Sequence, residues 1–371
     1  MNNDITYLSF NAADFTNVIT FVKSMGSKRT VLLLQKDEND LVCKACDDSN
    51  NYFIEYHVDL CGDKNDITEQ IAIPLVDLIS LTKYPCQSDK IEIRKQFNQY
   101  EMNVIGGGWL PFRTVEFNDN KFNFNSKETD IGEINSLKLK NVITYALSYT
   151  QEYTYVRDMY ITFTKSKMIA TYRQSSFTTV GNFVDMVLHR DVAIMLKTLL
   201  KSNFDLKIKS IKDDLIERTV FIGPKFKLTV TTSAIDNNVN NEYIDEIPNY
   251  ITISCDMLYK LAVFSEEYSA SKHILGLMIK DSKLNVSLKN ILAAKHQSVI
   301  NATTVGNVDD MAKEVEVPSH GLLKALKLFQ EKHSENVNIY ITDSNVENQH
   351  SFIIFDDDTQ ATINIYRWLE N

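Results

Sequence analysis

The chain has 371 residues, of which 44% are hydrophobic and 24% charged, an ordinary globular composition in a chain too long for one core. The net charge of −10 disfavours binding to nucleic acid unless the basic residues gather on one face. No stretch approaches the roughly 18 apolar residues of a membrane helix, and residues 1–4 lack the basic and apolar regions of a secretory signal, so we expect a cytoplasmic protein without membrane contact.

The first third of the chain alternates between strand-like and helix-like patterns. Apolar residues at every second position predict strands, and a period near 3.6 residues predicts helices. The predicted order is strand, helix and three strands, followed by the same order again. These elements are Ile5–Phe10, Asn11–Met25, Thr30–Lys36, Leu41–Asp47, Tyr52–Leu60, Gln70–Ile73, Leu75–Tyr84, Lys90–Lys95, Tyr100–Ile105 and Leu110–Phe117.

The same order recurs in the other two thirds, although no strand is assigned before the first helix of the middle third. The middle third is predicted to contain Ser136–Tyr149, Met159–Thr164, Lys167–Arg173, Phe177–Val180, Phe183–Leu188, Arg190–Ser202, Asp205–Ile211, Arg218–Ile222 and Lys225–Thr231. The last third is predicted to contain Tyr250–Ser254, Cys255–Tyr268, His273–Lys280, Lys283–Leu288, Gln297–Thr303, Lys313–Val317, Ser319–His333, Asn336–Thr342, Ser351–Asp356 and Ala361–Tyr366.

Six copies of one strand–helix–three-strand unit, about sixty residues apart, predict a repeat architecture. We expect an α+β fold of three domains with two units each, at residues 1–125, 126–247 and 248–371. The boundaries fall in the polar stretches Asn118–Thr129 and Ile235–Pro248.

Charge is distributed unevenly between the predicted helices and the rest of the chain. In chain order the six helices have net charges of 0, 0, +2, +2, −2 and +2, together +4, which leaves −14 for the strands and loops. Arg190, Lys197 and Lys201 share one stripe of their helix, as His320, Lys324 and Lys327 do on theirs. Such stripes are usually only solvated surface, but their concentration on the helices also fits a basic track for phosphate.

Several local segments resemble those of one known family. Met257–Ala262 and Ser269–Leu277 resemble a helix, a Ser-x-x-Lys turn and the strand after it, and Ile247–Ile253 resembles a Phe-Pro-Asp-Tyr segment. Met168–Phe177 and Ile363–Arg367 occupy the places of an Ala-Thr-Asp-Gly-His-Arg-Leu run and a Met-Pro-Met-Arg-Leu-like tail, from which they depart. Together with the repeat order, these segments resemble the bacterial β-type sliding clamp, the DNA polymerase III beta subunit, over essentially the whole chain.

The resemblance implies a ring with helices inside and sheets outside. It implies a processivity factor that encircles double-stranded DNA without sequence preference, tethers a replicative DNA polymerase and is placed by a clamp loader. The family's ring has twelve helices and this chain supplies six, so a homodimer is expected. The wealth of Asn, Lys, Ile and Asp suggests an AT-rich genome and a bacteriophage source, with the protein in the cytoplasm of an infected bacterium.

Three groups of site residues follow. The residues expected to contact DNA are Lys138, Lys140, Arg190, Lys197, Lys201, Lys324 and Lys327 and, through the resemblance, Tyr153, Tyr155 and Arg157. The groove expected to take partner peptides is lined by Tyr172, Phe177, Pro248, Ile253, Ile363 and Ile365. The dimer contact is expected to pair edge strands that contain Met102, Val104, Tyr268, Ile274 and Leu277. The alternative for the apolar members is ordinary strand core, in which case they would be fully buried.

No catalytic, metal or cofactor motif accompanies these groups. The five cysteines are an odd number, and Cys43 and Cys46 lie in a strand-like run without a second pair at zinc spacing. Gly106–Gly108 lacks the Lys-Ser/Thr of a phosphate loop, and Asp356–Asp358 is either a cation site or, more simply, an acidic hairpin turn. We therefore expect no enzyme and no cofactor. The alternatives are a repeat scaffold that binds proteins without DNA, and a hydrolase with an unrecognised site.

Overall fold

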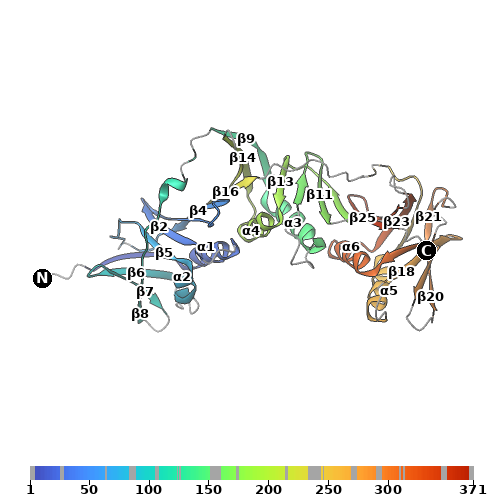
Figure 1. Ribbon diagram of the computed structural model, residues 1–371, viewed down its shortest axis with the longest axis horizontal. Helices are drawn as coiled ribbons and strands as arrows, with labels where there is room; N and C mark the ends of the chain where they lie inside the picture. The colour runs from blue at the N-terminus through green and yellow to red at the C-terminus, as the bar shows by residue number, and fades with distance from the viewer. Residues whose placement is uncertain are drawn as a thin grey trace. The chain divides into compact units, whose positions relative to one another are not determined.

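The computed structural model (Figure 1) describes residues 5–25, 29–62, 65–82, 89–104, 108–122, 124, 127–150, 160–172, 175–213, 216–232, 244, 246–268, 274–289, 295–308, 311, 314–343 and 349–366. The predicted α+β class is confirmed. Strands predominate, and six α-helices recur among them in the described residues. None of the helices in these ranges is long and apolar enough to cross a membrane.

The first third of the chain contains two copies of the predicted unit. Its elements are β1 (Thr6–Asn11), α1 (Ala12–Ser24), β2 (Val31–Asp37), β3 (Asp40–Cys46), β4 (Tyr52–Asp59), β5 (Ile71–Pro74), α2 (Leu75–Thr82), β6 (Lys90–Gln96), β7 (Gln99–Val104), β8 (Gly108–Phe112) and the short 3-10 helix η2 (Asp119–Phe122).

The middle third repeats this order. Its elements are β9 (Glu128–Asn135), α3 (Ser136–Thr150), β10 (Tyr160–Phe163), β11 (Lys167–Tyr172), β12 (Ser175–Val180), β13 (Met186–His189), α4 (Arg190–Leu199), β14 (Asp205–Asp213), β15 (Ile216–Ile222) and β16 (Phe226–Thr232). Strand β9 was not predicted, because only Ile131 and Ile134 are apolar in a run that also contains Gly132 at a φ of 156°.

The last third follows the same order with one additional short strand. Its elements are β17 (Tyr250–Ser254), α5 (Cys255–Tyr268), β18 (Ile274–Lys280), β19 (Lys283–Lys289), β20 (Lys295–Asn301), β21 (Thr303–Val305), β22 (Glu314–Pro318), α6 (Ser319–Glu331), β23 (Asn336–Asp343), β24 (Gln349–Phe355) and β25 (Thr359–Tyr366).

The chain packs as two compact units, one of residues 1–141 and 191–235 and the other of residues 142–190 and 236–371. In the first unit, strands lie in the order β5-β2-β3-β4-β16-β15-β14-β9, beside a four-stranded sheet β1-β6-β7-β8. In the second unit, the orders are β13-β10-β11-β12-β25-β24-β23-β17-β21 and β20-β19-β18-β22. The middle third of the chain thus contributes strands to both units, and the expected three-domain division remains a prediction.

The repeats exchange strands within each third. In each repeat, the three strands that follow the helix pair at one side with the strand that precedes the helix of the other repeat in the same third. For example, β1 precedes α1 but pairs with β6 in the sheet β1-β6-β7-β8. The long sheets arise where the last strands of two repeats pair. One junction pairs β4 with β16, and the other pairs β12 with β25.

The helices are amphipathic, and their apolar faces form the core with the sheets. Asn11 caps α1 by accepting a hydrogen bond from the Asp14 amide at 2.9 Å, and Phe15, Val18, Ile19 and Val22 are buried as the period predicts. Within their own units α1 packs beside α2 and α5 beside α6, as Figure 1 shows.

Candidate functional site

The basic stripe on α4 lies opposite its buried face. Val192, Met195, Leu196 and Leu199 are buried, while Lys197 is half-buried and Lys201, just after the helix, is exposed. The Lys201 ammonium donates a hydrogen bond to Asn17 Oδ1 on α1, so this stripe adjoins α1. Arg190, at the first position of α4, is half-buried.

A second stripe lies on α6, where Leu322, Leu326 and Phe329 are buried. Lys327 is exposed and Lys324 is half-buried. On α3, Lys138 is exposed and Lys140 is half-buried. Tyr153, Tyr155 and Arg157 lie outside the described residues. The exposed lysines Lys138 and Lys327 lie on helix surfaces and Lys201 lies just after α4, whereas the Lys324 ammonium is buried. Contact of these residues with DNA remains a prediction.

Three of the predicted lysines carry charge that no carboxylate neutralises. Among the described residues, Lys197, Lys201 and Lys327 form no ion pair. Some lysines of the sheets are neutralised by carboxylates: Lys209 and Lys227 lie 3.2 and 2.6 Å from Glu128, and they lower the pKa of that carboxyl group. The positive charge of Lys197, Lys201 and Lys327 therefore remains available to attract phosphate.

Helix α5 does not follow this trend. Its exposed residues include Asp256, Met257, Lys260, Phe264 and Glu267, and Lys260 pairs with Asp256 at 2.6 Å. The net charge of −2 found in the sequence is thus a real difference between helices. This face offers phosphate no net attraction.

The predicted peptide groove consists mainly of core residues. Phe177, Ile253, Ile363 and Ile365 are at most 7% exposed. Pairing brings Phe177 opposite Ala361 and Ile253 opposite Val337, and Ile363 lies close to Gly321 of α6, on the helix-covered face of the nine-stranded sheet. Their burial matches the strand-core alternative, because a docking wall needs accessible side chains.

Among the side chains of that group that the structure describes, Pro248 is exposed, and it lies two residues before β17. Tyr172 ends β11, where it pairs with Ser175, the first residue of β12. The assignment of partner docking to this region therefore remains a prediction with Pro248 as its accessible residue.

The expected dimer strands are not sheet edges, and that part of the prediction is wrong. Strand β7, with Met102 and Val104, lies between β6 and β8, and β18, with Ile274 and Leu277, lies between β19 and β22. Their backbone groups are already paired, and Met102 and Leu277 are buried in the core. Tyr268 is the last residue of α5.

The edge strands of these two sheets are instead β1 and β8 in one and β22 and β20 in the other. Of these, β8 and β20 each expose a large apolar side chain, Leu110 at 46% and Val299 at 54%. Alternation alone cannot distinguish an edge strand from an interior strand. A signal was nevertheless present in the sequence, because Pro111 has no N–H to donate and is tolerated mainly in edge strands.

The acidic turn Asp356–Asp358 connects β24 to β25, so the hairpin-turn prediction is confirmed. Its cation is the chain's own Lys332, whose ammonium lies 3.0 Å from Asp356 and also bonds to Asp358 and Thr359. The Asp358 carbonyl accepts a hydrogen bond from the Val180 amide at 2.8 Å. This turn therefore ties the end of α6 to the β12–β25 junction.

Buried thiols add no reactive centre. Burial raises the pKa of the Cys43 thiol far above its usual range and that of Cys255 to about 11. The described residues contain no group of three or more His, Cys, Asp or Glu side chains placed to hold a metal ion.

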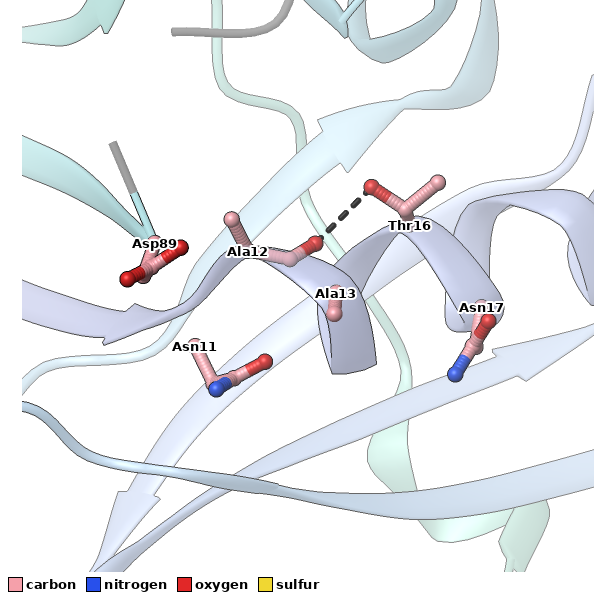
Figure 2. A pocket seen from close by; sticks show the side chains of 6 residues that line it. All are labelled: Asn11, Ala12, Ala13, Thr16, Asn17 and Asp89. Atoms are coloured by element: carbon pink, nitrogen blue, oxygen red, sulfur yellow. Dashed lines mark hydrogen bonds between the residues drawn. The ribbon is translucent and has the colours of Figure 1, made fainter. Parts of the chain in front are cut away.

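A surface hollow of about 620 Å³ lies at the start of α1, and no residue pattern in the sequence indicates it. Figure 2 shows its lining of Asn11, Ala12, Ala13, Thr16, Asn17 and Asp89. The Thr16 hydroxyl donates to the Ala12 carbonyl at 2.8 Å, and the Ala12 amide donates to the Asp89 carbonyl at 3.0 Å. Amides, a hydroxyl and one carboxylate line it without a cation, so it does not resemble a phosphate pocket.

Comparison of the sequence with protein-family models and with curated proteins finds no match. Solved structures do match. The DNA polymerase III subunit beta from Borrelia burgdorferi has a TM-score of 0.72 and 14% identity, with 98% of each chain covered. The sliding clamp from Pseudomonas aeruginosa bound to griselimycin has a TM-score of 0.76 and 13% identity, with 98% of this chain and 99% of that chain covered.

The beta sliding clamp of C. crescentus gives a similar result, with a TM-score of 0.75 and 13% identity over 98% of this chain and 100% of that chain. Identities this low establish the fold and leave the activity open. The chain has the fold of the bacterial DNA polymerase III beta sliding clamps over nearly its whole length.

Proposed function

We propose that the chain is a DNA sliding clamp, a processivity factor that closes as a homodimeric ring around double-stranded DNA and tethers a DNA polymerase. The observation that carries the proposal is the full-length likeness to sliding clamps. The unpaired lysines on α4 and α6 support it. A clamp acts by topology and requires no catalysis, so this function is not enzymatic. Its place would be the cytoplasm of a bacterium or of a phage-infected host.

The chemistry of the helix faces suits sliding. Lysines hold phosphate by charge, which carries no sequence information, and bridging water makes such contacts easily exchanged. In the proposed ring Lys138, Lys140, Arg190, Lys197, Lys201, Lys324 and Lys327 face the DNA, together with Tyr153, Tyr155 and Arg157. The acidic strands and loops would repel DNA from the outer surface.

Ring closure is proposed to pair β8 of one copy with β20 of the other, twice by symmetry. The two junctions inside the chain support this choice. Each pairs the outermost strands of two repeats, whereas β8 and β20 pair on one side only, with β7 and β19, in the described residues. A third junction of the same kind would continue the sheets and remove two exposed edges.

The internal junctions also define the register of the proposed joint. Leu228 faces Ile54 at one junction, and Ala361 faces Phe177 at the other. The paired positions can be traced across each sheet, from the strand that precedes a helix to the outermost strand. This places Leu110 of β8 at the position that Leu228 has in β16, and His296 of β20 at the position that Ile54 has in β4. We therefore propose that Leu110 of one copy lies directly opposite His296 of the other.

Partner proteins, including the polymerase and a clamp loader, are proposed to dock by short peptides near Pro248, at the entry to the last third. We further propose the three domains as residues 1–125, 126–247 and 248–371. Peptide docking suits a clamp, because a few anchor side chains give contacts that exchange readily between partners.

The decisive assay for this function is retention on DNA of different topology. The chain, with its loader or at a concentration that favours assembly, is incubated with nicked circular plasmid and passed over a sizing column. A clamp co-elutes with the circle and is lost after a restriction cut. Equal retention on circular and linear DNA would leave simple DNA binding, and no retention on either would favour a protein scaffold.

A further inference from the structure

An aromatic segment lies against the outer face of the β4–β16 junction. We call residues 117–122 and 124, which lie between β8 and β9, the strap. The Phe122 and Phe124 rings lie 5.5 and 5.1 Å from the Phe53 ring, both edge-on, and Phe117 lies 6.1 Å from Phe122. Edge-to-face pairs at these distances are favourable, so the strap is a packed element of the surface.

The surface beneath the strap is formed by both sides of the junction. Phe53 of β4 is directly opposite Thr229 of β16, and Thr229 is paired with Val220 of β15. All three are at most 4% exposed, although they alternate with the core residues Ile54 and Leu228 and so face outward from the sheet. Such burial on an outer face is what a covering segment produces.

Polar contacts fix the strap at both ends of this surface. Lys44 of β3 pairs with Asp119 at 3.2 Å and lies 5.8 Å from the centre of the Phe122 ring. On the other side of the junction, the Arg218 guanidinium lies 4.9 Å from the centre of the Phe124 ring. The strap is thus held by one ion pair and by two aromatic rings that lie beside cationic side chains, which are contacts that proteins use to recognise peptides.

The equivalent surface of the other junction has different chemistry. By strand register, Phe53 corresponds to Ser176 on β12, whereas Thr229 and Val220 correspond to Thr362 on β25 and Ile353 on β24, residues of the same character that are also buried. The two surfaces thus differ chiefly in the aromatic ring of Phe53, which is the ring that Phe122 and Phe124 contact. An aromatic groove is not a necessary consequence of joining two repeats.

We propose that the β4–β16 junction is a docking groove for a linear peptide with a carboxylate followed by two aromatic side chains, and that the strap is the chain's own ligand for it. The proposal rests on the proposed clamp function for its role, which is to control partner docking. Because a tethered segment acts at an effective concentration of about 1 mM, a free peptide opens the groove only if it binds better or is abundant. The strap therefore keeps this groove closed to weak partners.

The test is binding of a fluorescent peptide with the sequence of residues 118–124 to three full-length proteins. These are the wild type, the open variant F122S/F124S, and the matched control N120S, which changes an exposed strap residue. We expect the open variant to bind the peptide at least tenfold more tightly than the other two, and to ignore the same peptide with both phenylalanines replaced by serine. Equal binding to all three proteins, or no binding to a cooperatively melting open variant, overturns the proposal.

A second variant covers the case in which F122S/F124S does not fold. Phe122→Trp retains an aromatic ring and reports its environment through its emission, measured against the wild type. Titration with the peptide should move this emission to the red as the strap is displaced, and an unchanged spectrum up to several times the effective concentration of about 1 mM overturns the proposal. Retention on circular DNA is measured on the same wild-type protein. A lack of retention would refute the proposed clamp function, whereas the peptide titration tests the docking groove separately.

Discussion

Neutralising Lys197, Lys201 and Lys327 together should weaken the hold on DNA and reduce its dependence on salt. These three were chosen because none forms an ion pair among the described residues, so their charge is available to phosphate. Each phosphate contact contributes about 0.9 to the slope of log K against log salt. With all three in contact, the triple glutamine variant loses about 2.7 of that slope per subunit. Between about 50 and 200 mM salt the wild type then loses about 40-fold more affinity than the variant for each subunit in contact, or about 1,800-fold more for a dimer with both subunits in contact.

The assay is equilibrium binding of a fluorescent duplex across that salt range, with the dimeric state checked in each buffer. The matched control replaces Lys209 and Lys227, which are paired with Glu128 on a sheet, and should leave the slope unchanged. Folding should survive in both variants, because the altered side chains lie outside the core. A triple variant with the wild-type slope would refute the assignment of the helix faces to DNA.

Three further predictions concern the fold and the assembly. Lys332→Met should cost about 1–3 kcal/mol at neutral pH, since it leaves the acidic turn without its cation. The pKa of Asp358 is lowered and that of Lys332 raised. The loss of stability should therefore persist between about pH 4 and 10.5. It should fade as the pH falls through the folded pKa of Asp358 or rises through that of Lys332, which thermal melts across this pH range can measure. Phe177→Ala should cost about 3–5 kcal/mol in urea unfolding, as a core residue does, whereas a pocket residue would change partner binding with little loss of stability. Leu110→Asp should shift the protein toward monomers in sedimentation with an almost unchanged melt, and an unaffected dimer would place the joint elsewhere.

The order of elements was predictable because it depends on local periodicity. Strand β17 and helix α5 were predicted with their observed bounds, and Val192, Met195, Leu196 and Leu199 are buried in α4 as expected. Strand β9 escaped prediction because its stability comes from pairing with β14 and not from its own apolar content. Sequence distance gives no sign of such a partner some seventy residues away.

The site was less predictable, for two physical reasons. Alternating apolar residues look the same in an interior strand, an edge strand and a pocket wall. Met102 and Leu277 were therefore mistaken for edge residues. For the same reason, the predicted peptide groove near Pro248 includes buried residues such as Phe177. The strap was hidden for the opposite reason. Phe122 and Phe124 lie in a polar stretch that was treated only as a domain boundary, although two aromatic residues there were a signal of packing.

The claim that two copies close a ring around DNA can be tested by one covalent closure. In the double variant L110C/H296C, oxidation should link the copies, because directly opposed antiparallel residues lie about 4.5–5.5 Å apart at Cα, within disulfide reach. The pair L110C/S298C, two residues out of register, and each single cysteine serve as controls. After assembly on nicked circular plasmid and oxidation, we expect a dimer that stays on the circle in denaturant and leaves once the DNA is cut. Release from circular and linear DNA alike, with the disulfides formed, would contradict it.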